Sequence, residues 1–371
     1  MDAVERALHE REARVVALIT AVVSAAVTFI LLGCEPAPPG DGGETEAVTD
    51  TGGASGGGSS PPPLDPSTIE GHAAECREAL GRVPSFNCLE DGELIPITRD
   101  GVMIEDDAHA PGQRCDRPAL LTEDCNPWAR VGRLPGATLD GAPDPDVEWA
   151  FICRRYRLVS SVGDPRFQDV ALIGHRRSTG ATCFFQAYPD LESARVPAPG
   201  EPADETPPGA PTDEDFWLSP PETAYRECLR CHDADPWLHS PYVDQVRDPM
   251  TGGPLVPSGA ERGAPYFVVG EAFSEWARPR HISPEGNRCV SCHRVGTRTC
   301  MTFAMQAVGK SLLPALSERS RVFPGSHWMP GEHGLDKQEW DATYLESVAQ
   351  LIGCCAKPSR PGCNAADVPG A

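Results

Sequence analysis

The residue types most able to do chemistry in this chain are gathered in two short motifs. Both motifs read C-x-x-C-H, and their reactive residues are Cys228, Cys231, His232, Cys289, Cys292 and His293. On a helical turn, residues three positions apart project to the same side. The two thiols of each motif can therefore bond to one flat partner, and the adjoining imidazole can bind a metal ion at the centre of that partner.

This pattern is the attachment signature of a c-type haem, in which two thioethers hold the porphyrin and the histidine binds its iron. A zinc ribbon would need its cysteine pairs about 15–20 residues apart, whereas about 57 residues separate these two pairs. Ordinary disulfides are the other alternative. The two motifs predict two covalent haem c groups, with His232 and His293 as the proximal iron ligands.

The segment after the second motif resembles small cytochromes c over about residues 285–353. Met329 stands before a proline, and a predicted helix follows that ends before Gly353. The residues that give this helix its near-helical spacing are Trp340, Tyr344, Val348 and Leu351. The resemblance implies Met329 as the distal ligand of the second haem. His327 is the weaker alternative, and either residue could instead be an ordinary core methionine or surface histidine.

The distal ligand of the first haem has several candidates. His239 lies seven residues after His232, and His281 lies shortly before the second motif. Met250 is a third candidate, and an open or water-bound site is a fourth. A lone histidine in a loop is more often structural than a ligand.

The 15 cysteines divide into three groups. One is the candidate for lipid attachment, Cys34, and four belong to the haem motifs. The ten that remain are expected to form five disulfides in an oxidising compartment, and they are Cys76, Cys88, Cys115, Cys125, Cys153, Cys183, Cys300, Cys354, Cys355 and Cys363. Of the possible pairs, Cys153 with Cys183 is favoured because both lie on candidate strands.

The N-terminus carries an apolar, uncharged run over residues 15–33 that ends directly before Cys34. Residues 1–34 as a whole resemble a bacterial lipoprotein signal peptide, which implies export and lipidation of Cys34. An uncleaved membrane anchor is the alternative, since 19 residues can just span a bilayer. The expected location is the cell envelope, as an outer-membrane or periplasm-facing lipoprotein.

Composition divides the rest of the chain into four parts. Residues 35–71 and 196–215 are rich in proline and acidic residues and contain no basic residue, so both are predicted linkers. Residues 72–195 contain three candidate strands around 147–153, 169–174 and 181–185. The predicted fold class is therefore α+β and multidomain, with a small disulfide-linked antiparallel β domain followed by a mainly α or irregular dihaem module over 216–371.

The net charge of −22 argues against a nucleic-acid partner. The leading functional hypothesis is electron transfer outside the cytoplasm between redox protein partners, with the N-terminal lipid in the membrane. A dihaem peroxidase-like enzyme is one alternative, and a haem-based sensor or ligand-binding protein is another. No catalytic triad, phosphate loop or nucleotide fingerprint is found in the sequence.

Overall fold

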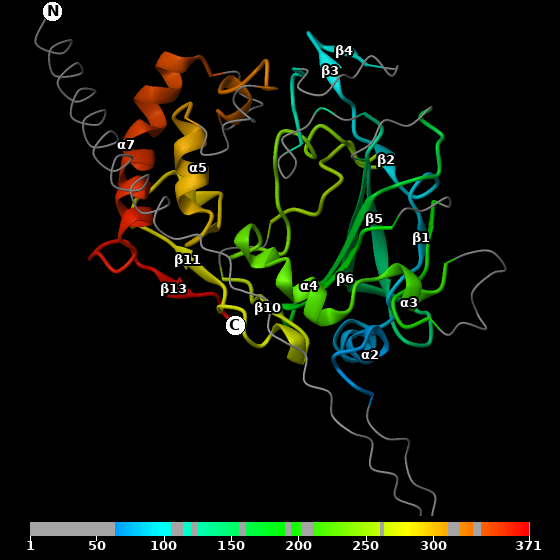
Figure 1. The fold of residues 1–371 in the computed structure, drawn as a ribbon. Coiled ribbons are helices and arrows are strands. Elements are labelled where there is room, and N and C mark those ends of the chain that lie inside the picture. Colours follow the sequence, from blue (N-terminus) through cyan, green and yellow to red (C-terminus); the bar gives the residue numbers. More distant parts are fainter. Residues whose placement is uncertain are drawn as a thin grey trace, which may run out of the picture. The chain divides into compact units, whose positions relative to one another are not determined.

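The structure is a computed structural model. It describes residues 64–370 apart from 105–113, 120–124, 126, 156–160, 190–193, 202–210, 260–262, 311–318 and 329–334. Residues from Leu64 onward form one compact unit that contains both helices and sheets (Figure 1). The predicted α+β class is confirmed.

The central element is a six-stranded sheet with the strand order β10-β8-β7-β6-β5-β2. Neighbouring strands are antiparallel except β8 and β10, which run parallel. The strand bounds are β2 Glu93–Leu94, β5 Arg130–Ala137, β6 Pro143–Arg154, β7 Asp169–Arg176, β8 Ala181–Ala187 and β10 Phe267–Val268. All three strands expected from the sequence are present, as β6, β7 and β8.

Shorter elements surround this sheet. The strand pairs are β1 (Phe86–Asn87) with β9 (Arg195–Val196) and β3 (Thr98–Arg99) with β4 (Val102–Met103), and a small sheet joins β11 (Arg280–Ile282) to β12 (Val295–Gly296) and β13 (Ala366–Asp367). The α-helices are α2 (Ile69–Leu80), α3 (Asp213–Phe216), α4 (Pro220–Tyr225), α5 (Cys300–Ala307) and α7 (Lys337–Ala356). Short 3-10 helices are η1 (Cys228–Arg230), η2 (Glu271–Phe273), η3 (Cys289–Ser291) and η4 (Gly325–His327).

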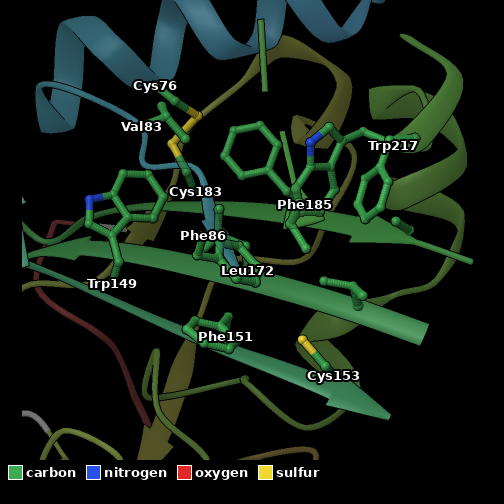
Figure 2. Close-up of a cluster of buried hydrophobic side chains, with 14 of the residues drawn as sticks. Cys76, Val83, Phe86, Trp149, Phe151, Cys153, Leu172, Cys183, Phe185 and Trp217 are labelled. Carbon is green, nitrogen blue, oxygen red and sulfur yellow. A yellow bond between two sulfur atoms is a disulfide. The ribbon is translucent and has the colours of Figure 1, made fainter. Parts of the chain in front are cut away.

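One face of the sheet packs against α2. Alternate residues of β6, including Trp149 and Phe151, are buried on this face, as the twofold repeat of a strand requires. Figure 2 shows these side chains beneath the Cys76–Cys183 disulfide, which joins α2 to β8. Trp217 also belongs to this core, although it lies beyond the predicted 196–215 linker.

The other face of the sheet is covered by residues that follow the first C-x-x-C-H motif. Ile152 and Ile173 point to this face, and they pack in a cluster with Trp237, Tyr242 and Val246. Residues from both predicted modules therefore build both cores, so the packing does not divide the chain at 196–215. The predicted 35–71 linker also overlaps ordered structure, because Thr68 caps α2.

Ten cysteines form five disulfides, and they are the same ten that remained after assigning the lipid and haem cysteines. The pairs are Cys76–Cys183, Cys88–Cys153, Cys115–Cys125, Cys300–Cys355 and Cys354–Cys363. The expected Cys153–Cys183 pair is wrong. Cys153 lies on β6 and Cys183 on β8, and β7 separates these two strands.

The predicted C-terminal helix is present as α7, with Trp340, Val348 and Leu351 buried along one side. The helix continues past Gly353 to Ala356, four residues further than expected. Cys354 and Cys355 hold this last turn, because they bond to Cys363 and to Cys300 of α5. Among the described residues, no helix is long and apolar enough to cross a membrane.

Candidate haem-attachment sites

The first motif forms a tight turn over residues 228–232, named here the first turn. It follows α4 after Glu227, which has a left-handed backbone with φ of 50°. The amides of Cys231 and His232 both donate to the carbonyl oxygen of Cys228, at 3.1 and 2.9 Å. Leu229 is buried, while Cys231 is exposed. The turn is thus anchored by its second residue and presents its second thiol to solvent.

The second motif forms the same turn over residues 289–293, named here the second turn. The amides of Cys292 and His293 donate to the carbonyl oxygen of Cys289, at 3.3 and 3.0 Å. Val290 is buried and Cys292 is exposed, as their counterparts are in the first turn. Two segments of different sequence therefore adopt one local geometry.

The cysteines of these two turns differ from every other described cysteine in having no disulfide partner. They are Cys228, Cys231, Cys289 and Cys292. Burial raises the pKa of the Cys228 and Cys289 thiols to about 11, so both thiols are protonated at neutral pH. In a chain with five disulfides, the two C-x-x-C pairs remain available for another bond.

His232 has a defined proton position. Its Nδ1 lies 2.9 Å from the carbonyl oxygen of Pro236, which can only accept a hydrogen bond. Nδ1 therefore carries the proton, and Nε2 has the lone pair that an iron ion needs. Burial lowers the pKa of His232 to about 4, which keeps the ring neutral. The ring of Phe184, from β8, lies edge-on at 5.5 Å between centroids.

His293 has different surroundings. Its ring contacts that of Phe303, on α5, with 5.0 Å between centroids. Burial lowers its pKa, so it is also neutral near pH 7. Among the residues that the structure describes, the His293 ring makes no hydrogen bond. Asn287 links the second turn to α7. Its side chain donates to the carbonyl oxygen of Ser347 on α7 and accepts from the Cys289 amide.

The candidate distal ligands of the first haem lie in separate places. Both ring nitrogens of His239 contact acceptors, with Nδ1 2.8 Å from Asp244 Oδ1 and Nε2 3.1 Å from the carbonyl oxygen of Pro257. His281 lies on β11 opposite Gly296 of β12. Met250 is 91% exposed on a surface turn. None of these placements selects one ligand.

Of the candidate distal ligands of the second haem and the candidate lipid-attachment residue, only His327 lies among the described residues. His327 is half-buried on η4, where its Nδ1 lies 3.0 Å from Ser326 Oγ, and it lines a small cavity with Ser240 and Tyr242. Met329 and Cys34 lie outside the described residues. Within the described part of the chain, no three His, Cys, Asp or Glu side chains form a metal-ion ligand set.

Two residues near the first turn were not expected from the sequence. Tyr266 is fully buried and donates to the carbonyl oxygen of His232 at 2.7 Å. Phe184 forms a wall beside the His232 ring. Strand alternation offered a signal for Phe184, because its neighbour Cys183 faces the α2 core and Phe184 must then face the other side.

The chain was also compared with protein-family models, with curated proteins and with solved structures, and none of the three comparisons found a match.

Proposed function

We propose that this protein transfers single electrons outside the cytoplasm through two covalently bound c-type haems. The observation that carries the proposal is the division of the cysteines. Ten of them form five disulfides, and the four without disulfide partners are the thiols of two matching turns, each followed by a histidine.

Each turn has groups that fit a haem. The two thiols of one turn can each add across a vinyl group, so that an S–C bond forms at one vinyl carbon and the thiol hydrogen passes to the other. The following imidazole is neutral and can donate Nε2 to iron; in His232 the Pro236 carbonyl holds the proton on Nδ1. The bound haems would supply the one-electron redox chemistry of iron.

The proposed arrangement is a mostly antiparallel, disulfide-linked sheet that supports the first haem turn, followed by a more irregular region with the second. Phe184 and Tyr266 support this arrangement, since both contact His232. We propose further that Cys34 carries a lipid, that the protein faces the periplasm or lies at the outer membrane, and that its partners are redox proteins.

Intact mass and a haem-stained gel test the central claim on the purified protein. The wild type should carry two haem increments, and Cys228→Ala plus Cys231→Ala should carry one. Cys289→Ala plus Cys292→Ala should also carry one. Cys354→Ala plus Cys363→Ala is the matched control, because it removes two cysteines of a disulfide and should retain both haems.

A wild-type mass without haem would overturn the proposal. Absorption spectra and a hydrogen peroxide assay then separate electron transfer from the enzymatic alternative. Two six-coordinate low-spin haems without peroxide turnover are expected for an electron carrier, whereas rapid turnover would identify a peroxidase. A spectral shift on adding a gas ligand, without fast electron exchange, would identify a sensor.

A further inference from the structure

Asp233, immediately after the first turn, is hydrogen-bonded through its side chain to the segment that follows the second turn. It directly follows His232 and is only 3% exposed. Its Oδ2 accepts hydrogen bonds from the amides of Arg298 and Thr299, the latter at 3.1 Å, and its Oδ1 accepts from Thr299 Oγ1 at 2.8 Å. Thr299 is the N-cap residue of α5, which follows the second turn. One carboxylate after the first turn therefore holds the start of the helix after the second.

The absence of a side chain at Gly296 makes space for the Asp233 carboxylate. A Cβ atom on Gly296 would lie 1.9 Å from Asp233 Oδ1, so a side chain there would displace it. The carbonyl oxygen of Asp233 also accepts from the amide of Arg280 on β11, at 3.1 Å. Backbone from three segments is thus fitted around Asp233.

A second connection runs in the opposite direction. Arg294, the residue after His293, reaches Asp235 with Nη2 3.7 Å from Oδ2. The Arg294 side chain is 1% exposed, and its Nη1 also donates to the carbonyl oxygen of Ala264. Each turn is therefore followed by a residue whose side chain reaches the chain beside the other turn.

We propose that Asp233 is a positioning residue that fixes the two turns, and hence the two haems, relative to each other. This inference rests on the proposed function. Electron exchange between two redox centres weakens steeply as they move apart, so a rigid connection between the turns sets the exchange between the haems. The chemistry needed is a side chain that accepts from two amides and a hydroxyl at once, and a buried carboxylate provides it.

The test uses variants that separate the hydrogen bonds of the Asp233 side chain from its negative charge. Asp233→Ala removes all three side-chain hydrogen bonds. Asp233→Asn keeps a carbonyl oxygen for the two amides, and its Nδ2 can donate to the Thr299 hydroxyl, which also accepts. Thr299→Val removes one bond and Thr299→Ser retains it. Asp336→Ala is the matched control, because Asp336 caps α7 by accepting from the Glu339 amide and not from the segment after either turn.

The measurement is the spin–spin splitting between the two ferric haems, recorded by electron paramagnetic resonance on protein shown by mass to carry both. We expect loss of the splitting in Asp233→Ala and its retention in Asp233→Asn. Thr299→Val should weaken it, while Thr299→Ser and Asp336→Ala should match the wild type. If Asp233→Ala does not take up both haems, the comparison of the splitting in Thr299→Val and Thr299→Ser tests the inference instead.

Three results would overturn the inference. They are a wild type with two haems but no splitting, a Thr299→Val or Asp233→Ala protein with wild-type splitting, and equal loss in Asp233→Ala and Asp233→Asn. Failure of the proposed function is distinguishable, because it appears earlier as a wild-type mass without haem.

Discussion

The two C-x-x-C-H turns share one backbone geometry but have different supports. The first turn rests against the central sheet, where Phe184 and Tyr266 contact His232. The second turn rests against helices, through Asn287 to α7 and through Phe303 of α5 to His293. We refer to the sheet with α2 and the first turn as the sheet side, and to α5, α7 and the second turn as the helix side. The same C-x-x-C-H pattern is therefore found in two different environments.

This difference affects the two histidines that we propose as proximal ligands. The Pro236 carbonyl fixes the proton of His232 on Nδ1, and such a hydrogen bond makes the ring a more basic metal ligand. Among the described residues the His293 ring has no such hydrogen bond, and it contacts the ring of Phe303. Local sequence determines that each turn forms, whereas tertiary packing makes the two sites chemically distinct.

The largest expected effect comes from removing the aromatic neighbour of each histidine. Phe184 is buried, so Phe184→Ala should destabilise the protein by about 3–5 kcal/mol. Phe303 is half-buried, and Phe303→Ala should cost less. In the haem-loaded protein, Phe184→Ala should change the absorption and magnetic spectra of the first haem, and Phe303→Ala those of the second. Urea unfolding and the two kinds of spectra provide the measurements.

Phe167→Ala serves as a control for Phe184→Ala. Phe167 is also fully buried, but its ring packs beneath Arg155. It should therefore lower stability without altering either haem spectrum. Equal spectral changes at both haems in Phe184→Ala would contradict the separation into two sides.

Sequence alone was sufficient for the local features of the site. The C-x-x-C-H spacing identified the two turns, the cysteine count identified the ten disulfide residues, and alternation in 147–153 identified β6. Pairing of the cysteines was not accessible, because strand order decides which strands are neighbours. The roles of Asp233 and Tyr266 were not accessible either, since they depend on contacts between residues more than 30 positions apart.

The second expected effect concerns acid stability, to which two buried histidines of the sheet side contribute. His72 lies on α2 between the rings of Phe185 and Phe273, and His175 lies on β7 beside Thr182. Both are buried, and burial lowers the pKa of each to about 4. In the unfolded chain a histidine titrates near 6.5. Between these pH values the unfolded state binds more protons, so stability falls as pH falls from about 6.5 to 4.

For His72 the loss should be about 2 kcal/mol between pH 7 and pH 5. Urea unfolding of the wild type and of His72→Gln at both pH values measures it. The variant should be less stable at pH 7 but should lose less on acidification. Parallel pH profiles for the two proteins would show that His72 is not responsible.

The smallest expected effect compares one helix cap from each side. Thr68 caps α2 by accepting from the Gly71 amide at 3.1 Å, and Asp336 caps α7 by accepting from the Glu339 amide at 2.8 Å. Thr68→Ala and Asp336→Ala should each lower the free energy of unfolding by about 1 kcal/mol, because each leaves an amide of the first helical turn without its acceptor.

Thermal unfolding of both variants, followed at the absorption bands of the haems, tests whether the sheet side and the helix side unfold together. If the two sides unfold together, both caps shift the same single transition. We expect this result because residues from Leu64 onward form one compact unit and Asp233 and Arg294 link the segments that follow the two turns. If Asp336→Ala shifts only the signal of the second haem, the helix side unfolds by itself, and the Asp233 connection does not transmit stability between the turns.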